Sequence, residues 1–280
     1  MPHRALPRWA ILPVLALLLG GCAPPPREPQ AIRLVEGLTA SYRVRVEERL
    51  LSEGMVGFML FTATLHRNEV VEFDLDLTIQ QVDQDSATVQ YRLHRVAVLS
   101  PEEKRLPERV VTARINPRTG DLKGLESPVS EHELEPARWL RGLLLIPPDG
   151  GQVEPGVLWT RAERFRLAGA EYEIGFDLPW RIRHDQTDRV DRQSVASLFV
   201  ERERRVNGAD LVGELRPDLT GRLTTSGFAR VDADTGLVRV MELQEQGRFS
   251  FPLTNGAPIP WMLVHLEGRL IVTRTHLYRP

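Results

Sequence analysis

The chain has 280 residues, and its 36 basic and 38 acidic side chains give a formal net charge of −2. Charges of both signs are mixed along the chain, and basic tracts such as 202–205 contain an acid, so we expect no nucleic-acid partner. The single cysteine, Cys22, excludes an internal disulfide. Stability must therefore come from packing and from the hydrogen bonds of secondary structure.

The first 21 residues have the pattern of a secretory signal peptide. A basic start with His3, Arg4 and Arg8 precedes an apolar stretch at 9–19, and two glycines follow it. The apolar stretch is about half of the ~20 residues that a membrane-spanning helix needs. Residues 1–21 are therefore predicted to be a targeting segment that is removed.

The tetrapeptide Leu19-Gly20-Gly21-Cys22 resembles the lipobox of bacterial lipoprotein precursors. The resemblance implies cleavage before Cys22, acylation of its sulfur and amino group, and attachment to a membrane by several acyl chains. In that family an Asp after the cysteine often marks retention at the inner membrane. Ala23 stands there instead, which favours the outer membrane, facing the periplasm. An ordinary signal peptide with a chance cysteine and an uncleaved anchor helix are the alternatives.

Residues 22–33 are predicted to be a tether between the lipidated cysteine and the folded domain. Four prolines at 23–30 exclude a helix or a central strand there. A polyproline-like segment of this kind, at ~3.1 Å per residue, reaches roughly 25 Å. It would hold a domain away from the membrane.

Beyond the tether, an alternation of apolar and polar side chains indicates half-buried antiparallel strands. At 42–47 apolar residues alternate with charged ones, and 72–77 repeats the pattern with acids outward. Further strands are predicted at 88–99, 110–115, 171–182, 195–206, 227–231, 237–246 and 263–275. The expected fold is mainly β, with an α+β fold at the margin.

Two segments predict an internal repeat. Residues 113–120 resemble 229–236, and the Val-Glu of 35–36 recurs at 153–154, with offsets of 116 (229 minus 113) and 118 (153 minus 35). We therefore expect two related antiparallel sheets, one in 34–146 and one in 147–280. Whether they form one curved sheet, a sandwich or two domains is left open.

One helix is predicted between the repeats. Trp139, Leu140, Leu143 and Leu144 fall at helical spacing after Pro136, and a proline-glycine linker at 147–151 ends the segment. We expect this helix to close repeat 1 and to pack its apolar stripe on a sheet.

The sequence contains no recognisable catalytic or metal-binding constellation. Its histidines are scattered, and it has neither a nucleophile elbow nor a phosphate-binding glycine loop, so we expect no cofactor and no enzymatic activity. The acids Glu72, Asp74 and Asp76 share one strand face, where paired carboxylates can perform acid–base chemistry. The competing interpretation, which we favour, is a solvated face that pairs across strands with Arg43 and Arg45.

The segment 58–61 is apolar on both strand faces, unlike its neighbours, and therefore needs cover on both sides. The cover is either the helix around Trp139 or a bound acyl chain, and Phe58, Leu60, Phe61 and Trp139 are the candidate lining of such a ligand site. Three functions follow. The first is an interaction or assembly module that docks an envelope protein by strand addition, the second a carrier of an apolar ligand, and the third a hydrolase that uses the acidic strand.

Overall fold

The structure is a computed structural model that describes residues 34–56, 59–60, 64–83, 86–100, 104–105, 107–116, 122–123, 143–145, 156, 158–161, 164–169, 172–177, 179–207, 220–252 and 261–280. Nearly all of these residues lie in β-strands, and none of them lies in an α-helix. No helix in these ranges is long and apolar enough to cross a bilayer. The expected mainly β, antiparallel fold is confirmed.

The strands are numbered along the chain. They are β1 (Thr39–Val56), β2 (Met59–Leu60), β3 (Thr64–Val82), β4 (Ala87–Ser100), β5 (Lys104–Arg105), β6 (Arg109–Ile115), β7 (Leu122–Lys123), β8 (Leu158–Arg161), β9 (Arg164–Gly169), β10 (Tyr172–Asp177), β11 (Trp180–Val190), β12 (Gln193–Asn207), β13 (Thr220–Asp232), β14 (Val238–Pro252) and β15 (Trp261–Tyr278).

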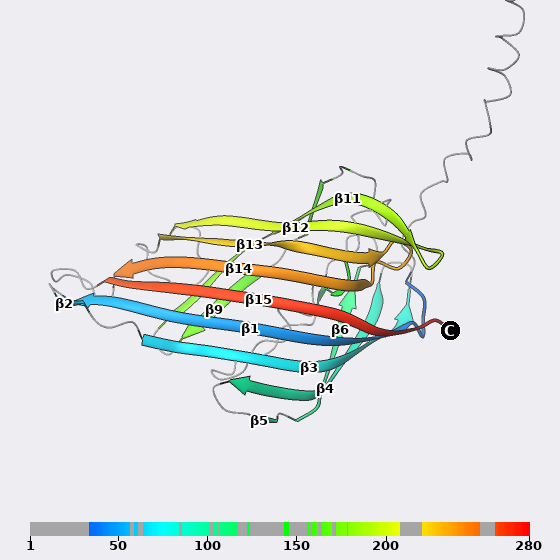
Figure 1. The fold of residues 1–280 in the computed structure, drawn as a ribbon, viewed down its shortest axis with the longest axis horizontal. Coiled ribbons are helices and arrows are strands. Elements are labelled where there is room, and N and C mark those ends of the chain that lie inside the picture. The colour runs from blue at the N-terminus through cyan, green and yellow to red at the C-terminus, as the bar shows by residue number, and fades with distance from the viewer. Residues whose placement is uncertain are drawn as a thin grey trace, which may run out of the picture.

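Thirteen of these strands form one sheet in the order β7-β6-β4-β3-β1-β15-β14-β13-β12-β11-β8, with β2 beside β1 and β5 beside β4. The first series, β1 to β7, extends from the middle of the sheet to one edge, where β7 lies. The second series starts with β8 at the other edge and reaches the middle of the sheet with β15. β15 pairs with β1, which joins the two series at the middle of the sheet. Figure 1 shows β12, β13, β14, β15, β1 and β3 lying side by side.

In the described residues, both series therefore belong to one continuous sheet, apart from β9 and β10, which form a separate two-stranded sheet. The proposed duplication stays a prediction. Residues 229–236 form the end of β13 and its turn, whereas 117–120 of the matching segment lie outside the described residues.

The single strand predicted at 171–182 is wrong. The segment forms two strands in different sheets, because β10 pairs only with β9 and β11 belongs to the large sheet. Pro179 lies between them. A proline has no N–H to give to a strand ladder, so the break falls at this position.

Side chains alternate between two faces of the large sheet. On β1, Tyr42, Val44 and Val46 are buried, each 1% exposed, while Arg43 and Arg45 point the other way. We call the buried side the inner face and the opposite side the outer face. The alternation predicted from the sequence is confirmed on β1 and β3.

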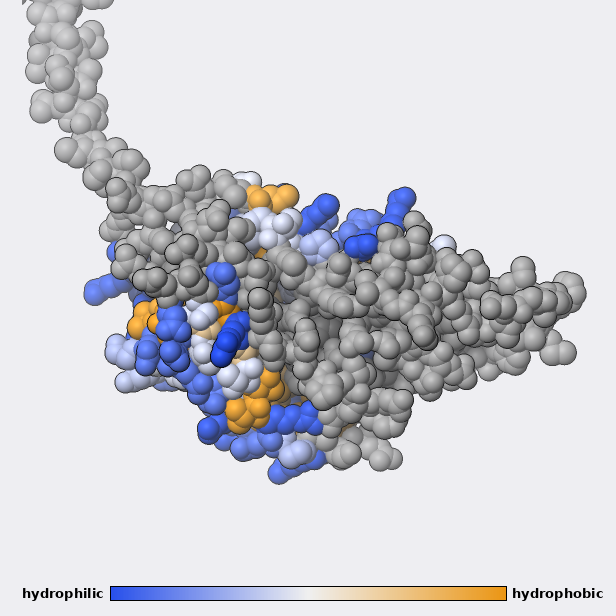
Figure 2. Space-filling view, turned by 180° about the vertical axis from the view of Figure 1, so that it is seen from behind, coloured by the Kyte–Doolittle hydropathy of each residue, from blue (hydrophilic) through white to orange (hydrophobic). Residues whose placement is uncertain are grey.

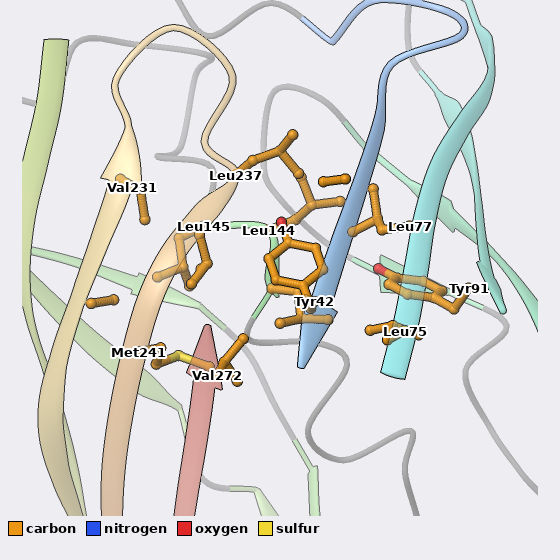
Figure 3. Close-up of a cluster of buried hydrophobic side chains, with 14 of the residues drawn as sticks. Tyr42, Leu75, Leu77, Tyr91, Leu144, Leu145, Val231, Leu237, Met241 and Val272 are labelled. Carbon is orange, nitrogen blue, oxygen red and sulfur yellow. The ribbon is translucent and has the colours of Figure 1, made fainter. Parts of the chain in front are cut away.

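The inner face carries a continuous hydrophobic core that draws on both series of strands. Figure 3 shows Tyr42, Leu75, Leu77 and Tyr91 from the first series gathered with Val231, Leu237, Met241 and Val272 from the second. Complete burial of one large aliphatic side chain contributes about 1.5–3 kcal/mol. The core therefore holds the two series together as one unit.

The segment Leu143–Leu145 packs onto this core. All three leucines are at most 1% exposed. Leu144 forms an isolated antiparallel bridge with Leu237, the Leu145 N–H donates to the Gly236 carbonyl at 3.1 Å, and Figure 3 shows Leu144 beside Tyr42. The apolar stripe therefore packs on the sheet at its Leu143–Leu144 end. Trp139 and Leu140 lie outside the described residues, and the helix itself stays a prediction.

Candidate functional site

The acidic side chains singled out in the sequence lie on the outer face of β3. Glu72 Oε1 lies 2.7 Å from Nη1 of Arg45, and Asp74 Oδ1 lies 3.7 Å from Nε of Arg43. Both arginines are on β1, which is directly beside β3. The favoured interpretation, cross-strand pairing with Arg43 and Arg45, is confirmed. Exposed pairs of this kind contribute about 0–1 kcal/mol each.

Asp76 joins a serine to a histidine. Ser41 Oγ donates a hydrogen bond of 2.6 Å to Asp76 Oδ1, and His94 Nε2 lies 3.4 Å from Asp76 Oδ2. A nucleophilic serine needs the histidine as its base, with the carboxylate behind the histidine. Here the carboxylate lies between the two, so the arrangement links β1, β3 and β4 without activating Ser41.

The inner face contains a buried polar group that sequence reasoning missed. Arg202 on β12 donates from Nε to Thr225 Oγ1 at 2.8 Å and from Nη2 to Glu245 Oε2 at 2.8 Å. Thr225 Oγ1 also donates to the same carboxylate oxygen at 3.1 Å. The guanidinium lies 4.6 Å from the centroid of the Trp180 ring. The side chains of Arg202 and Glu245 are each 1% exposed.

These residues form a transverse row. Arg202 is directly opposite Thr225, and Thr225 is opposite Glu245. The row continues through Gly268 on β15 to Glu48 on β1, which is 5% exposed. It is thus a polar band across five neighbouring strands, within a face that is otherwise mainly apolar.

The sequence did contain a signal for this row. Glu245 continues the inner-face alternation of Met241 and Leu243, and Arg202 continues that of Leu198 and Val200. The tract 202–205 counts as solvent-exposed by composition alone. Strand parity places its first arginine inside.

A second buried ionic group lies at the β13–β14 turn. Asp232 is fully buried, with Oδ1 2.5 Å from Nε of Arg239 and Oδ2 2.6 Å from Nη1 of Arg274. Arg239 Nη2 also donates to Gln193 Oε1. One carboxylate therefore joins β13 to β14 and β15, and a further hydrogen bond reaches β12. In the sequence, Asp232 is part of the repeated segment 229–236 and is not singled out as a charged site.

Tyr42 on β1 is opposite Arg274 of this group. Burial raises the pKa of the Tyr42 hydroxyl well above its usual range. The nearby Arg274 guanidinium lowers that pKa in part, and the Asp232 carboxylate raises it further. The phenol is therefore held neutral inside the core.

The sites predicted from the sequence fall mostly elsewhere in the chain. The lipidation site and lipobox (Leu19, Gly20, Gly21, Cys22) and three of the four candidate ligand-lining residues (Phe58, Phe61, Trp139) lie outside the described residues. Leu60 lies on β2, where it pairs with Met55. In the described part of the chain, no three His, Cys, Asp or Glu side chains are placed to hold a metal ion.

These features define a protein with a single large antiparallel sheet, an ion-paired outer face and two buried ionic groups. No family model matches the chain, and no curated protein does.

Among solved structures, the Salmonella SPI-1 type III secretion injectisome secretin InvG aligns at 10% identity and a TM-score of 0.19, over 88% of this chain and 66% of that chain. A chain in the atomic model of the injectisome basal body proteins InvG, PrgH and PrgK aligns at 10% identity and a TM-score of 0.19, over 88% and 46%. The chain thus spans less than two thirds of the length of both matched chains. Likenesses this low assign neither a fold family nor an activity.

Proposed function

We propose that the chain is a non-enzymatic lipoprotein of the bacterial envelope. In this proposal, acyl chains on Cys22 anchor it in the outer membrane, and its sheet faces the periplasm as an interaction or assembly module. The lipobox-like Leu19-Gly20-Gly21-Cys22 and the proline-rich tether support the anchor.

The observation that carries the interaction role is the packing of the inner face. Its core side chains are at most 8% exposed, so a partner would contact the outer face or an edge. On the side drawn in Figure 2, the described residues are mainly hydrophilic, with small and separate hydrophobic patches. A large apolar docking surface is absent from the described residues in that view.

An edge suited to strand addition lies on β11. Among the residues that the structure describes, β8 pairs with β11 only at 180–183, whereas 186–190 pair with β12 alone. Every residue from 185 to 190 is exposed. Added strands bind through main-chain hydrogen bonds, so this edge would accept an extended segment of an envelope protein.

The hairpin geometry identifies which amide groups face the partner. Val190 and Gln193 flank a two-residue turn whose residues Asp191 and Arg192 both have positive φ, 51° and 65°. Flanking residues of such a turn bond to each other, and the bonding direction then alternates. The N–H of Thr187 therefore points to the open edge.

Thr187→Pro tests docking at this edge, with Thr187→Val as the matched control. Both variants lose the 2.9 Å hydrogen bond between the Thr187 hydroxyl and His184 Nε2, but only proline removes the N–H. Crosslinking in intact cells should capture one reproducible envelope protein with the wild type and Thr187→Val, and not with Thr187→Pro. The edge proposal fails if Thr187→Pro captures the same protein, and the interaction role fails if the wild type captures none.

Cys22→Ala tests the anchor. Loss of the acyl chains should release or mislocalise the protein, as followed by membrane fractionation, while circular dichroism still shows the folded sheet. A variant that stays on the membrane and is fully processed contradicts the lipoprotein proposal.

The second candidate function is a carrier of an apolar ligand. The feature that supports it is the segment 58–61, which is apolar on both strand faces. A bound acyl chain would be lined by Phe58, Leu60, Phe61 and Trp139. Organic extraction of the purified protein followed by mass spectrometry should then yield a stoichiometric lipid, and an extract without lipid rejects the carrier.

A further inference from the structure

One transverse row on the outer face has an unusual order of side chains. From β11 to β14 it consists of Arg183, Phe199, Phe228 and Glu242, each directly opposite the next. Phe199 is 37% and Phe228 46% exposed. The Arg183 guanidinium lies 5.4 Å from the centroid of the Phe199 ring. The centre of the row is thus an exposed aromatic pair with a cation on one side and a carboxylate on the other.

Over the six strands β8, β11, β12, β13, β14 and β15, this row has an apolar residue on each side; beyond Ile271 it continues with Arg45 on β1, which lies past the strands that a second copy would cover. Leu158 on β8 is opposite Arg183 and is 59% exposed, and Ile271 on β15 is opposite Glu242. Over these six strands the order is apolar, cationic, aromatic, aromatic, anionic, apolar. In the opposite direction the order is the same except that the two charges are exchanged. If a second copy of the row is laid against this one in the opposite direction, apolar positions therefore meet apolar positions, aromatic meet aromatic, and each charge meets the opposite charge.

We propose that this outer-face row is a docking surface for a second copy of the chain. A twofold axis parallel to the strands, passing between Phe199 and Phe228, brings each phenylalanine onto the other one in the second copy. It also brings Arg183 onto Glu242 of the second copy, twice in each dimer. Face-to-face sheets pack with their strands nearly aligned and about 10 Å apart, which suits this geometry.

The neighbouring rows are compatible with the same axis. The row on one side consists of Arg181, Glu201, Ser226 and Gln244. The axis sets Arg181 against Gln244 and Glu201 against Ser226. On the other side it sets Ser197 against Arg230. None of these contacts places like charges together, and each offers a hydrogen-bond donor to an acceptor.

The size of the surface predicts a weak dimer. Six strands about 4.8 Å apart and three rows about 7 Å apart cover roughly 600 Å² on each copy, or about 1,200 Å² in total. This area is at the low end for a specific interface, and it corresponds to a transient dimer with a dissociation constant in the micromolar range.

The test is sedimentation velocity of the full chain in a neutral detergent, over a concentration series. Arg183→Glu sets two glutamates against each other in the dimer, and Glu242→Arg sets two arginines against each other, so each should weaken association by at least about tenfold. The charge-swapped double variant Arg183→Glu/Glu242→Arg restores opposite charges across the interface and should associate more strongly than either single variant. It should stay weaker than the wild type, because Glu242 also pairs with Arg269 of its own chain at 2.6 Å and this pair is lost. Arg248→Glu, an exposed reversal further along β14, is the control and should leave association unchanged.

A second pair of substitutions tests the aromatic centre. Phe199→Ser/Phe228→Ser should abolish association, with an unchanged circular dichroism spectrum and melting midpoint showing that the sheet is intact. A wild-type chain that stays monomeric at 100 times the expected micromolar range overturns the proposal and leaves the row to a different partner. A charge-swapped double variant no stronger than the single variants overturns it as well.

Discussion

Asp232→Asn should destabilise the protein far more than Asp234→Asn, although the two residues lie in the same turn. Asp232 is fully buried and its two carboxylate oxygens meet Arg239 and Arg274 at 2.5 and 2.6 Å. Asp234 is 41% exposed and meets Arg279 at 2.7 Å. The substitutions are chemically identical and nearly isosteric, so the comparison isolates burial.

The expected change in the free energy of unfolding depends on how well solvent can screen the arginine that loses its carboxylate partner. Removal of one partner of a buried ion pair costs about 3–5 kcal/mol, because the remaining charge is left uncompensated. Asp232 has two such partners, with Arg239 18% and Arg274 9% exposed. We therefore expect a loss of at least about 3 kcal/mol in the free energy of unfolding. Asp234→Asn loses one solvent-screened pair and should cost at most about 1 kcal/mol.

Urea unfolding followed by circular dichroism measures both values, and thermal melting provides a check. A loss of 3 kcal/mol corresponds to a decrease of roughly 6–12 °C in the melting midpoint of a domain this large. The reasoning is refuted if Asp232→Asn stays within about 1 kcal/mol of the wild type, or if both variants lose the same amount.

Three further predictions concern the inner face. Glu245→Gln should cost about 3–5 kcal/mol in urea unfolding. The double variant Arg202→Met/Glu245→Met should recover much of this loss, because neither partner of the pair then remains as an uncompensated buried charge. Gly227→Ala should lower the free energy of unfolding by at least about 1–3 kcal/mol, because the added Cβ would overlap a carbonyl oxygen of β14. The control is Gly268→Ala, whose added Cβ would have its nearest contact at 3.4 Å; it should change the free energy of unfolding by less than about 1 kcal/mol. Tyr42→Phe should reduce the decrease in the free energy of unfolding above about pH 10. The pKa of the Tyr42 phenol is higher in the folded than in the unfolded protein, so its contribution to stability is fully present below the unfolded pKa and is lost as the pH rises toward the folded pKa. Equal alkaline slopes for the variant and the wild type would contradict it.

Much of the sheet follows from the two-residue alternation of the sequence. The pattern at 42–47 assigns Tyr42 and Val44 to the core and Arg43 to the outer face, as the structure has them. The same alternation predicts the charged pairs of Arg43 with Asp74, because acids and arginines on one face of neighbouring strands meet. The alternation along a single strand is sufficient here, because the face on which a side chain lies does not depend on which strand is its neighbour.

The Asp232 group could not be predicted in this way, because two irregular pairings bring it together. The register of β13 and β14 shifts between Arg230 and Val231, so that Arg239 is an extra residue opposite this point. The register of β1 and β15 shifts between Ser41 and Tyr42, which places Tyr42 opposite Arg274. Such bulges redirect single side chains, and simple alternation gives no sign of where they occur.

The two buried ionic groups share one physical consequence. A buried ion pair is a poor source of net stability compared with apolar packing, but its loss on one side only is costly. Arg202 and Glu245 join β12 to β14 across β13, and Asp232 joins β13 to β15 across β14. A one-residue slip of any of these strands would turn its side chain to the outer face and leave its partner charged inside the core. We therefore infer that these groups fix the register of β12 to β15, in a sheet whose other inner-face contacts are mainly apolar and less specific for register.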